Sequence, residues 1–185
     1  MPRLIEQASD NPEFPRVIDL ARLRDTPEFA FDIAPSPEES AMLAELMDAR
    51  TVRKMRFAGK LTALASGGWQ LDGELGATVV QNCVVTLDPV TSRVDQRVRR
   101  AYLPNVAPRG TEVILSGVDE DEEVEPLPDR LDLGLVAVEA LALALPAYPR
   151  KEGASLADLG FGADEDVVKP FAALAALRDK LDNGS

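Results

Sequence analysis

Six basic residues occupy strand-like positions in two segments of the chain, and their chemistry is that of phosphate binding. One trio is Lys54, Arg56 and Lys60, and the other is Arg93, Arg97 and Arg99. Because successive side chains of a strand point to opposite faces, each trio shares one face. On the solvent side of one sheet, the six would bind phosphate by charge neutralisation. The alternative is an ordinary polar face on which Asp72, Glu74 and Asp95 pair with these bases.

This basic patch would lie within an acidic chain. The protein has 185 residues and a formal net charge of −12, which disfavours nucleic-acid binding through overall charge. Residues 50–110 nevertheless carry ten Arg and Lys against four acids, whereas residues 111–132 carry one base against nine acids. We interpret the acidic run at 119–125 as a solvated loop. The alternative is a mimic of phosphate that shields the basic face.

The residue types of the chain argue against a catalytic site and against a metal site. The chain has no histidine and one cysteine, which excludes a Cys/His zinc site and a Ser-His-Asp or Cys-His centre within one chain. Phosphate-loop, dinucleotide and metal-helix motifs are absent from the sequence. Cys83 follows the apolar phase of its strand and is expected to be a buried, unreactive thiol. We expect no enzyme, no cofactor, no metal and no small-molecule substrate.

The basic residues must be positioned by a long antiparallel ribbon. From Trp69 to Leu87 the odd positions are mostly apolar, and after a bend at Asp88-Pro89 the apolar phase continues on Val94, Val98 and Tyr102. Residues 52–64 form a preceding strand, joined to the ribbon by a hairpin turn at 66–68. The length of the ribbon predicts a curled, barrel-like antiparallel sheet.

Two helices are predicted beside this sheet. Ser36-Pro37-Glu38-Glu39 has the pattern of a capping box and begins a helix that extends to about Ala49. Asp132 caps a second helix, which runs through Leu145 and is stopped by Pro146. This second helix is apolar on nearly every side, so we expect it to be buried and to cover the sheet. The predicted fold class is α+β.

The chain divides into four segments. Residues 1–27 form an N-terminal extension with few core anchors, residues 28–149 the core α+β domain, and residues 150–169 a linker rich in Gly, Asp and Glu. Residues 170–185 form a short amphipathic helix whose apolar stripe is Phe171, Leu174, Leu177 and Leu181. We expect this helix to dock on its own domain, or alternatively in a groove of a partner.

Cysteine usage and hydropathy indicate the compartment. A single cysteine cannot form an internal disulfide, which fits a reducing environment. The longest apolar run, Leu133 to Leu145, contains Glu139 and is too short to span a bilayer. We therefore expect a cytoplasmic protein without a membrane segment.

Three segments, in order, resemble one family. Residues 82–90 (Asn-Cys-Val-Val-Thr-Leu-Asp-Pro-Val), residues 132–146 and residues 169–174 (Lys-Pro-Phe-Ala-Ala-Leu) are similar to motifs of YceD-like proteins. These are the large ribosomal RNA subunit accumulation proteins of bacteria and plant organelles. The resemblance implies a role in processing or stabilising large-subunit ribosomal RNA, with no known catalysis. Many members carry cysteine pairs that could hold a metal. Here Thr86 stands at the second position, so Cys83 is carried over as a core position only.

Two classes of function follow. The first is a non-catalytic factor in ribosomal RNA processing and accumulation, and thus in ribosome biogenesis, that contacts RNA through its basic sheet face. The second is an acidic protein-interaction module that binds a ribosomal protein or an assembly enzyme with its acidic loops and C-terminal helix.

Overall fold

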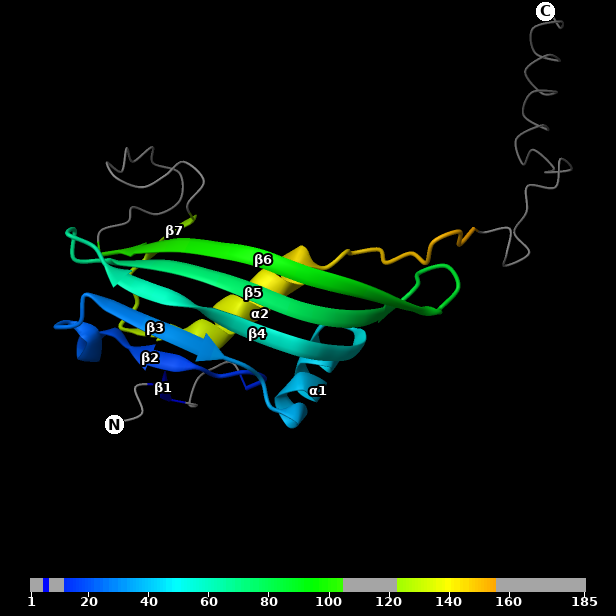
Figure 1. The fold of residues 1–185 in the computed structure, drawn as a ribbon, viewed down its shortest axis with the longest axis horizontal. Coiled ribbons are helices and arrows are strands. Elements are labelled where there is room, and N and C mark those ends of the chain that lie inside the picture. Colours follow the sequence, from blue (N-terminus) through cyan, green and yellow to red (C-terminus); the bar gives the residue numbers. More distant parts are fainter. Residues whose placement is uncertain (1–4, 7–11, 105–122, 156–185) are drawn as a thin grey trace, which may run out of the picture.

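The computed structural model describes residues 5–6, 12–104 and 123–155 (Figure 1). The predicted C-terminal helix at 170–185, with Phe171, Leu174, Leu177 and Leu181, lies outside the described residues. So do residues 156–169 of the predicted linker and residues 119–122 of the acidic run.

A five-stranded main sheet dominates the molecule. Its strand order is β3-β4-β5-β6-β7. The strands are β3 (Glu28–Ile33), β4 (Ala49–Ala63), β5 (Trp69–Asn82), β6 (Pro89–Leu103) and β7 (Glu123–Pro126). Strands β3 to β6 pair antiparallel, which confirms the predicted hairpin between β4 and β5, whereas β7 pairs parallel to β6.

The predicted phase of the ribbon is confirmed within β5 and β6, but it is wrong for residues 83–87, which form a turn in which Leu87 is 67% exposed. Leu71, Leu75 and Val79 of β5 are fully or almost fully buried, and so are Val94, Val98 and Tyr102 of β6. Removing each of these side chains from water stabilises the fold by about 1.5–3 kcal/mol. The bend at Asp88-Pro89 is the end of a short turn between β5 and β6. Strict alternation therefore fixes which face of the ribbon meets water.

A β-bulge interrupts the alternation of β4. The register against β5 shifts between Arg53 and Arg56, and Lys54 has a φ of 52°. Val52 and Met55 are consequently both buried although they are three positions apart. A bulge inserts one unpaired residue and so exchanges the two faces of the strand on its N-terminal side.

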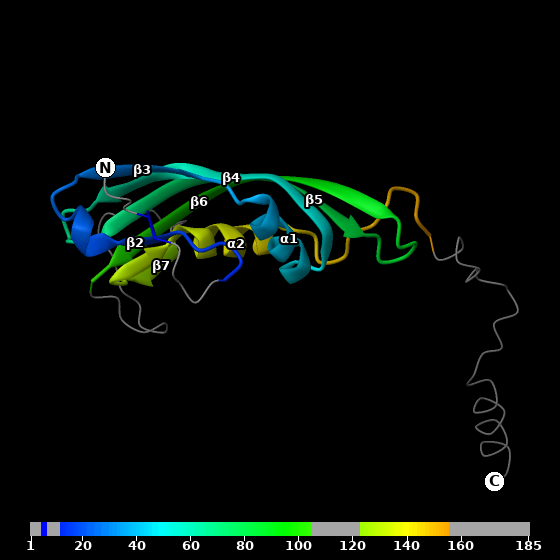
Figure 2. The same ribbon diagram turned by 90° about the horizontal axis from the view of Figure 1, so that it is seen from below.

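The remaining elements cover one side of the main sheet. Helices α1 (Pro37–Leu46) and α2 (Leu133–Ala144) lie with β2 (Val17–Asp19) on its concave side (Figure 2). A small second sheet has the order β1-β2-β8, in which β1 is Ile5–Glu6 and β8 is Arg130–Asp132. The α+β class is confirmed. The described residues form two open sheets, and the barrel-like closure is not confirmed.

The prediction of few core anchors in residues 1–27 is wrong. Phe14, Ile18 and Leu23 are buried, the last in the 3-10 helix Leu20–Leu23. Strand β2 pairs with β8, far away in the sequence, and local patterns do not reveal such a pairing. At the same junction a Cβ added to Gly134 would lie 1.7 Å from the carbonyl oxygen of Phe14. The N-terminal segment is thus packed tightly against the start of α2.

Both predicted helix starts are confirmed. Ser36 and Glu39 form the capping box of α1, and the Asp132 side chain accepts hydrogen bonds from Gly134 and Leu135 at the start of α2. The prediction that α2 is buried is confirmed for seven of its twelve residues, but Leu143 is 84% exposed. The covered side of α2 faces the main sheet and the N-terminal segment. No helix among the described residues is long and apolar enough to cross a membrane.

Candidate nucleic-acid interface

The six predicted bases lie on one face of the main sheet. We call the face opposite α1 and α2 the outer face. Strand β4 brings exposed Lys54, Arg56 and Lys60 to it, and β6 brings exposed Arg93, Arg97 and Arg99. Strand β5 lies between the two trios, with Asp72 opposite Arg99 and Glu74 opposite Arg97. The geometry therefore places the six together, and their binding of RNA stays a prediction.

Four of the six bases have acidic partners on the same face. Arg56 pairs with Asp32, Lys60 with Glu28 at 2.8 Å, Arg93 with Asp95, and Arg99 with Asp72 at 2.9 Å. The hydrogen bonds from Arg56 and Arg93 hold the pKa values of Asp32 and Asp95 below their usual range. Acids of the edge strand β3 supply two of these partners, which the sequence pattern did not reveal.

Three bases of the outer face lack an acidic partner among the described residues. Among the described residues, Arg53, Lys54 and Arg97 have no acidic partner within the 4.0 Å limit of an ion pair. Sequence reasoning missed Arg53, because strict alternation places it in phase with buried Met55. The bulge moves it to the outer face, where it lies opposite Thr78. The apolar Val52 next to it was the one signal for this change of phase.

A shallow hollow of about 670 Å³ lies on the outer face beside the bulge. Lys54, Arg56, Arg93 and Arg97 line it together with the acids Glu74 and Asp95. Gly76 lines it too, and a Cβ there would lie 2.8 Å from an Nη of Arg93, so the glycine leaves room for that guanidinium. Such a set of donors can bind an anion with several oxygens.

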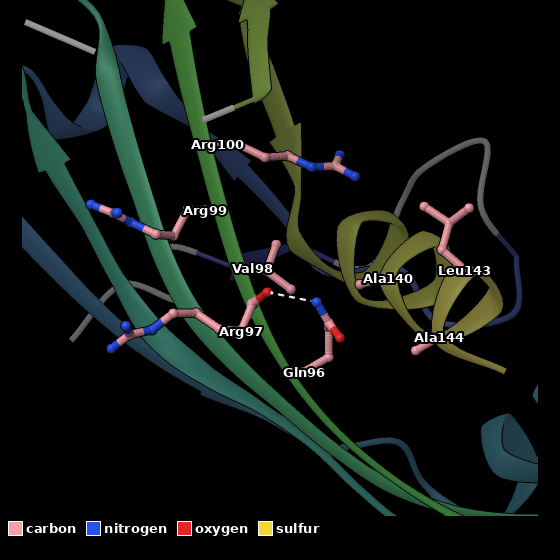
Figure 3. A pocket seen from close by; sticks show the side chains of 8 residues that line it. All are labelled: Gln96, Arg97, Val98, Arg99, Arg100, Ala140, Leu143 and Ala144. Carbon is pink, nitrogen blue, oxygen red and sulfur yellow. Dashed lines mark hydrogen bonds between the residues drawn. The ribbon is translucent and has the colours of Figure 1, made fainter. Parts of the chain in front are cut away.

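Arg100 points to the other side of β6 (Figure 3). Figure 3 shows Arg97 and Arg99 on one side of the strand and Arg100 on the other side, toward α2. A second hollow lies between β6 and α2, and both Arg100 and Leu143 line it. The Arg100 side chain is 8% exposed, and its Nη1 lies 3.0 Å from Glu125 Oε1 and 2.9 Å from Glu139 Oε2. Arg100 therefore connects β6, β7 and α2 and is not part of the outer face.

The acidic run is partly ordered structure. Its last residues, Glu123 to Glu125, belong to β7, so a solvated loop does not describe them. Glu125 pairs with Arg100 on the side of α2 and thus does not shield the outer face.

Cys83 is buried, as predicted, but it lies in the turn after β5 and not within the strand. Its sulfur accepts hydrogen bonds from the backbone N–H groups of Lys151 and Thr86, each at 3.4 Å. The Lys151 donor and then the Thr86 donors lower the pKa of Cys83 to about 6, against the opposing effect of desolvation.

In the part of the chain that the structure describes, no group of three or more His, Cys, Asp or Glu side chains could hold a metal ion.

A comparison with protein families gives one match. The model of the family described as "Large ribosomal RNA subunit accumulation protein YceD" matches residues 71–178, which is more than half of the chain. The match begins in β5, continues through α2 and extends past the last described residue, Ser155. No curated protein and no solved structure matches the chain.

Proposed function

Because the chain belongs to the YceD family of large ribosomal RNA subunit accumulation proteins, we propose that it acts as a non-catalytic factor that contacts RNA through its outer face. Membership implies a role in the accumulation of large-subunit ribosomal RNA. We further propose that the protein contacts RNA, that it has no catalytic activity and that it is cytoplasmic.

The observation that carries the proposal is the set of unpaired bases beside the hollow. Arg53, Lys54 and Arg97 come from two strands, and none has an acidic partner among the described residues. Phosphate oxygens would satisfy these donors and release condensed counterions. Three such contacts give a slope of log affinity against log salt of about −2 for single-stranded RNA.

The side chains of the outer face favour recognition of the shape of an RNA over recognition of its nucleobases. The described residues of β3 to β6 place their aromatic side chains, such as Phe57 and Tyr102, in the core. Base stacking on the outer face is therefore disfavoured. Phosphate contacts position a protein on RNA without reading its sequence. We expect weak, salt-dependent binding that tolerates changes in RNA sequence.

The test is a pair of charge-matched double variants. Lys54→Glu with Arg97→Glu reverses two unpaired bases of the outer face, whereas Arg24→Glu with Arg150→Glu makes the same change in net charge at exposed positions elsewhere. Binding to a large-subunit ribosomal RNA fragment is measured by fluorescence anisotropy over a series of salt concentrations. The outer-face variant should flatten the salt slope by about 1–2 units, and the control should keep the wild-type slope. Equal isotherms for both variants would contradict the proposal.

A protein partner is the competing proposal. An acidic chain could bind a basic ribosomal protein or an assembly enzyme instead of RNA. A pulldown from growing cells, carried out with and without nuclease, separates the two. Partners that remain after nuclease treatment would favour protein binding, and partners that disappear would favour RNA.

A further inference from the structure

A second surface with binding character lies on the side of the helices, where α1, the β5–β6 turn and the end of α2 meet. We call it the end groove. It has a volume of about 440 Å³. Its lining is mostly apolar and includes Leu46, Met47, Val84, Ala142, Leu145 and Pro146.

Two features of the described residues mark the end groove as an incompletely satisfied surface. Leu46 is 52% exposed and Val84 is 47% exposed, although both are large apolar side chains. Gln81 also lines the groove; it is only 9% exposed, and its side-chain carbonyl oxygen has no hydrogen-bond partner among the described residues. A buried acceptor without a donor costs about 1–3 kcal/mol, and exposed large apolar side chains at the rim favour an apolar occupant.

The chain leaves the domain at the edge of this groove. Pro149 lines the groove, and its carbonyl oxygen accepts a hydrogen bond from the Val84 N–H at 2.9 Å. Lys151 is held to the same turn, because its Nζ lies 2.9 Å from Asp88 Oδ2 and its N–H donates to Cys83 Sγ. The described residues end four positions later, at Ser155.

We propose that the end groove binds the chain's own C-terminal segment, residues 170–181. This segment carries the apolar stripe of Phe171, Leu174, Leu177 and Leu181 at helical spacing. The family match continues into it, through residue 178, so the segment belongs to the family pattern.

The connection is long enough to reach the groove. The stretch from Ser155 to Pro170 has a root-mean-square span of about 20 Å when flexible and of roughly 50 Å when fully extended. A short flexible connection of this kind holds a segment at an effective concentration on the order of millimolar. Even a weak apolar contact would then be populated within one molecule.

Charge also favours this occupant. Asp48 lines the groove next to the end of α1, and the last turn of that helix contains no basic residue. The C-terminal end of a helix attracts cations. Arg178 and Lys180 lie beside Leu177 and Leu181 in the segment, on either side of Asp179, so one of these two bases can face Asp48. The outer face is not involved, and this inference does not depend on RNA binding.

The experiment uses the full chain and two amide spectra. Leu174→Asp with Leu177→Asp interrupts the apolar stripe and changes no residue of the described core, so we expect the domain to stay folded. If the segment occupies the groove, the amide resonances of Val84, Ala142 and Ala147 shift between wild type and this variant. A synthetic peptide of residues 168–185 is then added to the variant and should return these resonances toward their wild-type positions. Identical spectra of wild type and variant would overturn the proposal.

Groove variants and one control locate the contact. Val84→Asp, made in the chain that carries the two tail substitutions, should abolish peptide binding. Leu135→Asp, at an exposed position of α2 outside the groove, should leave it unchanged. Asp48→Asn removes one charge without a change in shape and should weaken binding by about threefold. Equal peptide affinity in all three variants would contradict the site. If Val84→Asp fails to fold, equal affinity of Asp48→Asn and Leu135→Asp would contradict it. A spectrum that changes on dilution, with a dimer in sedimentation, would assign the groove to a second copy and overturn the intramolecular proposal.

Discussion

Replacing Arg100 with methionine tests whether one buried guanidinium stabilises the contact of β7 and α2 with β6. The side chain is 8% exposed and pairs at 3.0 Å and 2.9 Å with Glu125 and Glu139. Removing one partner of a buried pair costs about 3–5 kcal/mol, because the other charge stays in a site of low dielectric. Here the remaining carboxylates are 31% and 46% exposed, so water can solvate them. We therefore expect the free energy of unfolding to fall by about 2–3 kcal/mol.

Urea denaturation measures this loss against two further variants. Arg97→Met changes a neighbouring residue of β6 that is exposed and has no acidic partner among the described residues, and it should stay within about 0.5 kcal/mol of wild type. Glu139→Gln leaves Arg100 its bond to Glu125 and should cost about 0.5–1 kcal/mol. The matched pair of arginines separates the buried contact from a general effect of charge.

Hydrogen exchange shows where the loss occurs. The Leu127 N–H donates to the Leu103 carbonyl oxygen at 2.9 Å, just after β7. This amide should exchange faster in Arg100→Met than in Arg97→Met, because the former frees β7 from the sheet. If both variants unfold at the same urea concentration, the reasoning about Arg100 is refuted.

Three other changes test the packing described above. Ser36→Ala removes the oxygen that accepts the Glu39 N–H at 3.2 Å and should lower the free energy of unfolding by about 1 kcal/mol in urea denaturation, whereas an unchanged midpoint would contradict the cap. Gly134→Ala forces α2 away from the Phe14 carbonyl and should cost about 2–3 kcal/mol or more, so a melting temperature equal to wild type would show that the junction is loose. Thiolate absorbance of Cys83 should titrate with a midpoint at about 6 in the folded protein, while thiol reagents react only after unfolding. Because the unfolded thiol holds its proton up to its ordinary pKa of about 8.5, stability should rise with pH between these two values and stay flat in Cys83→Ala.

Strand phase was predictable from the sequence wherever alternation is strict. The apolar positions of β5 have period two from Trp69 to Val79, and Val94, Val98 and Tyr102 keep this phase in β6, so Val79 and Val98 were placed in the core correctly. The phase of β4 failed at Lys54, because a bulge with a positive φ at a residue other than glycine leaves little trace in sequence. Arg53 reaches the outer face for this reason alone.

Partners across the fold were less predictable. Arg100 lies at an alternate position between buried Val98 and Tyr102, and this strand position indicated that the arginine is buried. Its acids come from β7 and α2, whose positions depend on the topology and not on local pattern. The same holds for Glu28 and Asp32, which neutralise bases of the outer face only because β3 pairs with β4.

Crosslink mapping can show whether RNA contacts the outer face in cells. Cells that express the full chain are irradiated, RNA bound to the purified protein is digested, and the crosslinked peptides are identified by mass spectrometry. We expect crosslinks to large-subunit ribosomal RNA at residues of β4 and β6 around Arg53, Lys54 and Arg97, and their loss in the Lys54→Glu, Arg97→Glu variant. Crosslinks confined to segments away from the main sheet, or equal crosslinking of wild type and variant, would contradict this contact.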